Sequence, residues 1–162
     1  MKERRQVELQ IMHRRGVKFQ QMPCKEVRQY YYRKGDDLVS VPFLKMSVIY
    51  FVIGVGFGMY MSTAHDYDLT GVHAHINLVG WASFALAGLI YTAFPRAGSH
   101  ILSKIHFWLH NVGLPLMMIG LILLVYDVTA TEFIIPVGAV LVVLGTILFA
   151  VNVLMNVRAA QR

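Results

Sequence analysis

The chain has 162 residues, of which 56% are hydrophobic and only 15% are charged, and its formal net charge is +6. Soluble domains are about 45–50% apolar and about 25% charged, so this composition argues against a soluble enzyme, a disordered chain or a DNA-binding domain. The single cysteine, Cys24, excludes an internal disulfide, a cysteine-based zinc cluster and covalent attachment of a c-type haem.

Residues 1–42 form a basic segment that differs from the rest of the chain. Residues 1–45 hold eleven of the fifteen Lys and Arg side chains, and this confinement is why no nucleic-acid partner is expected. Three apolar residues would share one face of a basic helix that lies on anionic lipid: Val7, Ile11 and Met12. We favour a solvated, mobile cytoplasmic tail, and a third interpretation is that the working chain starts near Met46. The segment 43–157 is the predicted membrane domain.

Four apolar runs follow, each about as long as the ~20 residues that cross a hydrocarbon layer about 30 Å thick. They contain no Asp, Glu, Lys or Arg. The runs are Met46–Ala64, Gly71–Phe94, Ile105–Tyr126 and Phe133–Met155. We therefore expect an all-α fold, an integral-membrane four-helix bundle with helices at about 43–64, 71–94, 105–126 and 133–155.

The positions of the positive charges predict how these helices are oriented. Segments 65–70 and 127–132 contain no Lys or Arg, whereas the N-terminal tail, the 95–104 loop and the C-terminal tail contain all fifteen. By the positive-inside rule, both termini are expected in the cytoplasm of a bacterium, with the chain in its inner membrane.

Six histidines from residue 65 onward fall into two groups by expected membrane depth. The outer ends of the first two helices hold His65, His73 and His75. The inner end of the third helix and the loop before it hold His100, His106 and His110. At about 1.5 Å per residue, in a core about 30 Å thick, the groups are roughly 18 Å apart, so one metal ion cannot be held by both. Ionisable side chains at membrane depth mark function by default.

The helical period separates His73 from His75 by about 200°. The face of His73 is small, polar and aromatic, which is typical of a bundle interior: Asn77, Gly80, Phe84, Gly88 and Tyr91. The face of His75 is an apolar stripe: Val79, Ala82, Leu86, Leu89 and Ala93. This stripe predicts a partner for His75 outside the bundle, either a second subunit or a flat apolar cofactor. The alternative is an interfacial His75 that reaches the lipid headgroups.

Two other spacings suggest close contacts. Gly54 and Gly58 form a GxxxG step in the first helix, which predicts close approach of a neighbouring helix and places His65 beside the top of that neighbour. In the third helix, His106 and His110 are four residues apart and share a face. We favour a hydrogen-bonded histidine pair at the cytoplasmic interface over a metal site.

The ligand types available at membrane depth favour haem. Neutral imidazole is a common ligand of haem, copper and zinc, and the spans offer no cysteine or carboxylate for a thiolate or hard-cation site. Haem is flat and largely apolar, and its propionates would reach water near the outer face. Haem therefore suits the setting better than a bare metal ion.

Two linked motifs resemble consecutive helices of subunit I of the haem-copper oxidases, the cytochrome c oxidase and nitric-oxide reductase type. The segment Val72–Trp81 (VHAHINLVGW), with Tyr91–Pro95 (YTAFP), resembles the late helix that carries a His-x-His pair. The segment Lys104–Leu109 (KIHFWL) is similar to the helix that follows it. The resemblance covers roughly residues 71–124, and the chain reads like a small four-helix relative of subunit I.

The resemblance implies roles for individual residues. In the family the first histidine of the pair ligates the high-spin haem and the second the low-spin haem, which implies that His73 and His75 are ligands of haem, here expected to be b-type. His106 corresponds to a histidine that is not an iron ligand. The missing ligands would come from His65 or another subunit. Residues expected to surround the ligands are Asn77, Trp81 and Tyr91. The copper-binding His-Pro-Glu-x-Tyr motif and the His-His pair are absent, so no copper is expected.

These observations leave three functions open. The favoured one is a membrane haem protein that transfers electrons or binds a small gas near the outer face. The first alternative is a subunit of an oxidase or nitric-oxide reductase completed by a partner chain, so whether the chain takes part in catalysis stays open. The second is a non-catalytic accessory or assembly subunit. The expected partners are the lipid bilayer and either further copies of the chain or a respiratory complex.

Overall fold

A computed structural model describes residues 39–128 and 133–157 of the chain. These residues belong to one compact unit, Leu38–Arg162. The apolar stripe expected within residues 1–38 lies outside the described residues.

The described residues form helices and contain no strand. The helices in chain order are α3 (Ser40–Ala64), α4 (Thr70–His75), η2 (Ile76–Ala82), α5 (Ser83–Ala93), α6 (Pro95–Gly98), α7 (Ile101–Val125) and α8 (Ile134–Asn156). Segments α4, η2 and α5 follow one another without a break and make one long helix, Thr70–Ala93, whose middle part η2 is a π-helix. The predicted all-α fold class is confirmed for the part of the chain that the structure describes.

Four helices are long and apolar enough to cross a membrane: Ser40–Ala64, Thr70–Ala93, Ile101–Val125 and Ile134–Asn156. The bilayer is therefore the environment that these helices fit. Two of them begin earlier than expected, α3 at Ser40 rather than near 43 and α7 at Ile101 rather than 105. Apolar runs locate the hydrocarbon core, whereas the backbone hydrogen bonds of a helix continue into polar residues. At the start of α7, the His100 Nδ1 accepts a hydrogen bond of 3.3 Å from the Leu102 N–H.

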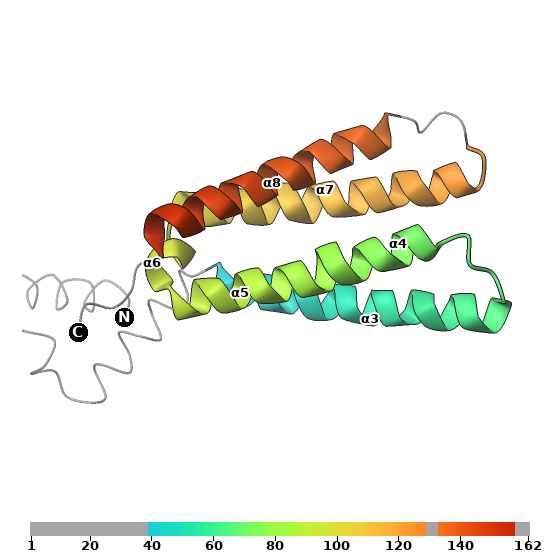
Figure 1. Cartoon of the computed structure of the whole chain (residues 1–162), viewed down its shortest axis with the longest axis horizontal. Coiled ribbons are helices and arrows are strands. Elements are labelled where there is room, and N and C mark those ends of the chain that lie inside the picture. Colours follow the sequence, from blue (N-terminus) through green and yellow to red (C-terminus); the bar gives the residue numbers. More distant parts are fainter. Residues whose placement is uncertain (1–38, 129–132, 158–162) are drawn as a thin grey trace, which may run out of the picture. The chain divides into compact units, whose positions relative to one another are not determined.

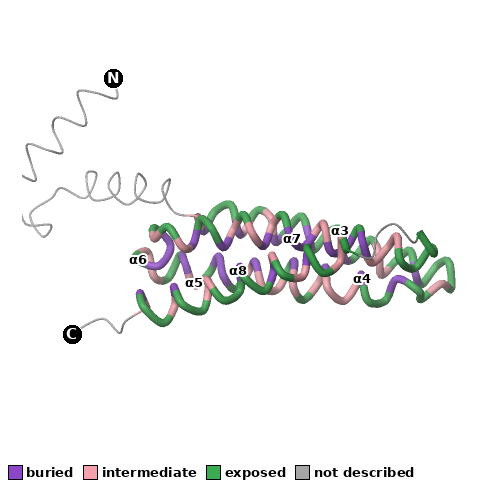
Figure 2. Tube along the Cα trace, turned by 90° about the horizontal axis from the view of Figure 1, so that it is seen from above, coloured by how far each residue is buried: buried purple, intermediate pink, exposed green. Residues whose placement is uncertain are grey.

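The helices form two antiparallel hairpins, which Figure 1 shows one above the other. In one hairpin α3 packs against the long helix α4–η2–α5, and in the other α7 packs against α8. The turn between α3 and α4 lies at the same end as the last turn of α7, and α6 lies at the opposite end. Buried residues recur along every long helix among exposed ones (Figure 2). This alternation is expected of helices that face a neighbour on one side and lipid on the other.

Glycines allow the close packing of α7 and α8. A Cβ atom on Gly138 would lie 2.5 Å from the Met117 backbone nitrogen and 2.8 Å from the Gly113 carbonyl oxygen. A Cβ on Gly113 would in turn lie 2.8 Å from the Gly138 carbonyl oxygen. Because backbone atoms cannot move aside cheaply, only glycine permits this separation. Small residues at such contacts are typical of helices in membranes.

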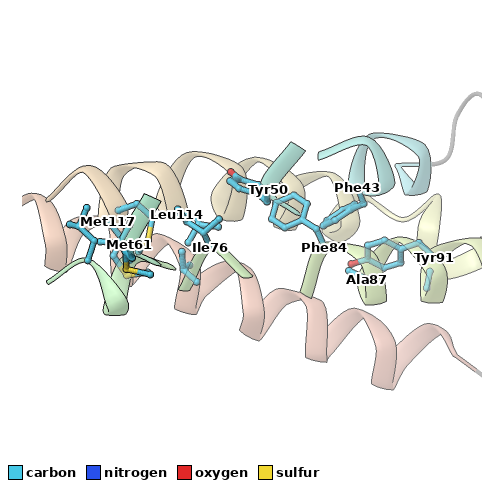
Figure 3. Close-up of a cluster of buried hydrophobic side chains, with 14 residues drawn as sticks. Phe43, Tyr50, Met61, Ile76, Phe84, Ala87, Tyr91, Leu114 and Met117 are labelled. Carbon is cyan, nitrogen blue, oxygen red and sulfur yellow. The ribbon is translucent and has the colours of Figure 1, made fainter. Parts of the chain in front are cut away.

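Aromatic rings fill the core of the α3–α5 hairpin (Figure 3). The ring centroid of Phe84 lies 5.0 Å from that of Phe43 and 5.4 Å from that of Tyr50. Phe43 also lies 5.1 Å from Phe107 of α7, so the same cluster joins the two hairpins. In lipid, helices gain little from hiding apolar surface from each other, so close packing and polar contacts must hold the hairpins together.

Candidate functional site

His73 lies in the contact between α4 and α3. Its Nδ1 atom is 3.0 Å from the Gly54 carbonyl oxygen, and a Cβ on Gly58 would lie 2.9 Å from its Cε1 atom. The imidazole therefore fills the groove that the two glycines leave on α3. The close approach predicted from the GxxxG step is confirmed, and α4 is the neighbour that makes it.

Asn77 continues this contact by one helical turn. Its Nδ2 donates to the His73 carbonyl oxygen at 2.9 Å, and a Cβ on Gly54 would lie 2.6 Å from the Asn77 amide. The remaining residues of the same face are buried in the bundle: Gly80, Phe84, Gly88 and Tyr91. The interior face predicted from the helical period is thus confirmed.

His75 lies half-buried on a different side of the helix. Its Nδ1 is 2.7 Å from the Gly71 carbonyl oxygen of its own helix. The Nδ1 of His75 thus has a partner one turn earlier in its own helix, whereas the partner expected outside the bundle, a second subunit or a flat apolar cofactor, stays a prediction. Leu86 and Leu89 of the same stripe are exposed, as expected for a lipid-facing surface, whereas Val79 packs against the core.

His73 and His75 are held in the same way, each by a backbone carbonyl. A carbonyl oxygen only accepts hydrogen bonds, so Gly54 and Gly71 each require a proton on the Nδ1 atom facing them. The neutral ring then carries its free lone pair on Nε2. Metal-binding histidines are commonly oriented by this kind of bond from the other ring nitrogen. His73 and His75 thus each present the tautomer that an axial ligand of haem requires.

The two rings differ in the space around them. The His73 ring is partly buried and packs against the glycines of α3, where a Cβ on Gly58 would lie 3.8 Å from its Nε2, so this side of the ring has no room for a flat macrocycle while the helices stay packed. The His75 ring lies beside a lipid-facing surface and can meet a flat apolar group from outside the bundle. No three His, Cys, Asp or Glu side chains within 39–128 and 133–157 cluster closely enough to hold a metal ion. The residues present therefore fit haem at His75 and not at His73.

The other outer candidates, His65 and Trp81, lie apart from the contact of His73 with the glycines of α3. His65 ends α3 in the left-handed conformation, at φ 53°, and is exposed. Among the described residues no hydrogen bond joins it to His73, so its proposed role as the partner of His73 gains no support. Trp81 is 40% exposed and its ring centroid lies 4.6 Å from that of Phe51. Its packing partner in the structure is therefore α3.

The π-helix was not expected, because the spacing predicted a regular α-helix over 71–94. In η2 the wider turn changes which backbone carbonyls find partners within the helix. The Leu78 carbonyl accepts from Ser83 Oγ at 2.8 Å, five residues on. The Val79 carbonyl is 3.1 Å from Nε2 of His110 in the other hairpin. Apolar periodicity carries no signal of such a turn, since it reports side-chain faces and not carbonyl partners.

Two of the inner histidines, His106 and His110, form part of the bundle core. Both are only 3% exposed. His106 Nδ1 lies 3.1 Å from Tyr91 Oη, and His110 Nε2 faces the Val79 carbonyl. Both histidines are hydrogen-bonded, as expected, but not to each other: the two ring centroids are 5.5 Å apart and each imidazole bonds the opposite hairpin. The reason is that Tyr91 of α5 and the Val79 carbonyl of η2 lie within hydrogen-bonding distance of these two rings, whereas no hydrogen bond joins the rings themselves.

Further polar contacts join elements distant in sequence. Tyr50 Oη donates to Asn111 Oδ1 at 3.3 Å, which joins α3 to α7. Asn152 Nδ2 donates to the Ala97 carbonyl at 3.0 Å, and Asn156 Nδ2 donates to Asn152 Oδ1 at 2.8 Å. No role was predicted for these asparagines from the sequence. Their spacing of four residues in an apolar run was the available signal.

One apolar groove of about 430 Å³ lies beside α3 and α7. It is lined by Ile53, Gly56, Phe57, Tyr60, Leu69, Ile122 and Tyr126. No histidine lines this groove, so it offers no axial ligand for haem.

No family model, curated protein or solved structure matches this chain. The resemblance to subunit I of the haem-copper oxidases therefore rests on the two motifs alone.

Proposed function

We propose that the chain is a haem-binding membrane protein, related to oxidase subunit I, that acts in electron transfer or small-gas binding near its outer face. The observation that carries the proposal is the Nδ1 contact of His75 with the Gly71 carbonyl at 2.7 Å, which leaves Nε2 free beside a lipid-facing surface. The positions of Lys and Arg, in the two tails and the 95–104 loop, support a topology with both termini in the cytoplasm of a bacterium.

Each chain would supply one haem ligand, His75. His73 stays in the glycine groove and positions α4, and with it His75, against α3. Where the haem serves in electron transfer, a further ligand would come from another copy of the chain or from a respiratory partner. A two-fold axis would place the same His75 on both sides of one haem.

The haem, when bound, supplies one-electron chemistry or gas binding at its iron. The chain's own residues orient and shield it. The Gly71 carbonyl would hold the His75 tautomer, and the exposed apolar side chains of Leu86 and Leu89, further along the same stripe, leave that face of the helix to lipid. The protein would set the redox potential through this burial and through the hydrogen bond to Nδ1.

The test is an absorption spectrum of the full chain purified in mild detergent, with haem per chain and oligomeric mass measured together. We expect a Soret band that sharpens on reduction, and a loss of both haem and self-association in His75→Ala. The matched control is His100→Asn, because Asn retains a side-chain acceptor at the N-cap position of α7. Full haem content in His75→Ala would contradict the assignment.

A second function, a non-catalytic accessory or assembly subunit without a cofactor, is favoured by one observation. The His73 ring packs against the glycines of α3, so at least one of the two histidines has a packing role. Absence of haem from the wild-type chain, after expression with haem supplied, would support this second function. A carbon-monoxide-sensitive spectrum would instead indicate an open coordination position and gas binding.

A further inference from the structure

The π-turn in η2 changes the backbone partner of Val79. In an α-helix each N–H bonds the carbonyl four residues earlier, so the Ser83 N–H would bond the Val79 carbonyl. In η2 the Ser83 N–H bonds the carbonyls of Leu78 and Gly80 instead. The Val79 carbonyl, which loses this α-helical donor, lies 3.1 Å from Nε2 of His110 in the other hairpin. The imidazole of His110 thus stands in for the missing donor.

The orientation of the His110 ring follows from this contact. A carbonyl oxygen only accepts hydrogen bonds, so Nε2 carries the proton of the neutral ring. The other nitrogen, Nδ1, is buried and has no hydrogen-bond partner within the described residues. Buried polar atoms without a partner are rare and destabilising, so another requirement must decide how such a ring is turned. Here the ring satisfies the Val79 carbonyl and leaves its own second nitrogen unpaired.

The spacing of buried residues shows that η2 contains one residue more than a regular α-helix would. Buried residues recur at intervals of four along this part of the helix: Val72, Ile76, Gly80 and Phe84. The step of twelve residues from Val72 to Phe84 therefore completes three turns, whereas an α-helix completes three turns in about eleven residues. At about 100° per residue, a regular α-helix would place Val72 about 120° away from the direction of Phe84. The π-turn removes this offset by turning α4 through about the angle of one residue.

This rotation decides where the outer histidines face. In a regular α-helix each position on α4 would be taken by the next residue of the chain. Ala74 would then face the glycine groove of α3 that now holds His73, and His75 would move to the present place of Ala74. That place is about 200° from buried Val72, on the side away from the bundle interior. The same rotation explains why Val79, expected on the outer stripe, packs against the core.

The sequence of α4 is compatible with either rotation, so a bond from another helix can decide between them. In the regular α-helix His73 and Asn77 would take the interior places of Val72 and Ile76. Those two polar residues are the ones that the helical period alone puts on the interior face. Ala74 is small enough for the groove between α4 and α3.

We propose that His110 is a positioning residue for His75, the haem ligand of the proposed function on which this inference rests. His110 bonds η2 and not α4, so it acts on His75 through the helix between them. Its bond to the Val79 carbonyl holds the π-turn, the π-turn fixes the rotation of α4, and α4 directs His75. Without that bond the Val79 carbonyl takes back the Ser83 N–H, η2 becomes a regular α-helix, and α4 turns by about 100°.

The test is solid-state NMR of the full chain in lipid bilayers, with carbonyl-labelled glycine and ring-labelled histidine. The contact between the His73 ring and the Gly54 carbonyl joins α4 to α3, so it reports the rotation of α4. The contact between the His75 ring and the Gly71 carbonyl lies within one helix, so it shows that α4 is intact. We expect both contacts in the wild type. In His110→Leu we expect loss of the first contact and retention of the second.

Two further variants distinguish positioning from simple packing. His110→Gln keeps a side-chain N–H that can donate to the Val79 carbonyl, so it should retain the His73–Gly54 contact. Deletion of Leu78, an exposed residue of η2, removes the extra residue and gives a regular α-helix with α4 in its present rotation. This deletion should leave the His73–Gly54 contact in place in the wild-type chain and restore it in His110→Leu.

Deletion of Val52 is the matched control for deletion of Leu78. Val52 is also an exposed apolar residue, but it lies in the middle of the regular α-helix α3. Its deletion turns one half of α3 against the other and should not restore the contact in His110→Leu. Retention of the His73–Gly54 contact in His110→Leu would overturn the proposal. Loss of that contact on deletion of Leu78 alone would also overturn it, and this second result does not depend on the folding of His110→Leu.

The outcome is separate from that of the haem proposal, because both contacts are read without haem. Haem per chain is then measured in the same variants, and we expect it to be lost in His110→Leu, retained in His110→Gln and regained when Leu78 is also deleted from His110→Leu. A wild type that shows both contacts but binds no haem would refute the haem proposal, and with it the role of His110 toward a haem ligand. Haem in the wild type, together with an unchanged His73–Gly54 contact in His110→Leu, would refute this inference alone.

Discussion

Gly58→Ala tests the contact that positions the outer histidines. Alanine is favoured over glycine in a helix interior by about 0.5–1 kcal/mol, so the substitution would stabilise α3 by itself. At Gly58, however, the new Cβ would lie 2.9 Å from Cε1 of His73, closer than the roughly 3.5 Å at which carbon atoms pack best. The ring must move, and its bond to the Gly54 carbonyl is lost.

The magnitude follows from comparison with Gly56→Ala in the same helix. Both variants gain the same helix preference, but a Cβ on Gly56 meets nothing within 4 Å. Loss of one hydrogen bond costs about 0.5–1.5 kcal/mol, and crowding that the ring cannot relieve costs about 1–3 kcal/mol. We expect Gly58→Ala to be less stable than Gly56→Ala by about 1.5–4.5 kcal/mol, which is at least about 10-fold in the folded-to-unfolded ratio.

The assay is reversible unfolding by a denaturing detergent in mixed micelles, followed by circular dichroism. A double-mutant cycle with His73→Ala separates the steric contact from other effects. In the His73→Ala background the ring is absent, so Gly58→Ala should become as favourable as Gly56→Ala. An equal penalty in both backgrounds would refute the reasoning, because the cost would then not come from contact with His73.

Two further predictions concern topology and metal content. In a Cys24→Ser background, a membrane-impermeant thiol reagent added outside should modify Asp68→Cys and not Ser99→Cys, because the basic segments are expected inside; labelling at Ser99 alone would reverse the orientation. The purified chain should hold no stoichiometric copper, because the copper-ligand motifs are absent; elemental analysis showing about one copper per chain after removal of adventitious metal would contradict this.

The helices and their inward faces were predictable from the sequence because both depend on local order along the chain. Uncharged runs long enough to span hydrocarbon lie where the four long helices form. The helical period placed Gly80, Gly88 and Tyr91 on one face, and all three are buried. The GxxxG step at Gly54 and Gly58 marked the surface on which α4 packs. Helix starts were less accurate, because hydropathy reports the membrane core and not the backbone hydrogen bonds.

The tertiary structure decided the partners of the polar groups that bond another helix. His106 and His110 bond the other hairpin instead of each other, whereas His75 bonds its own helix. A hydrogen bond depends on distances of about 3 Å between atoms, and the apolar pattern along a chain does not determine how two hairpins align at that scale. The π-turn in η2 brings the Val79 carbonyl to His110. By itself, the sequence determined that histidines lie in apolar helices, and only the packing of the two hairpins decided which imidazole nitrogens were left free.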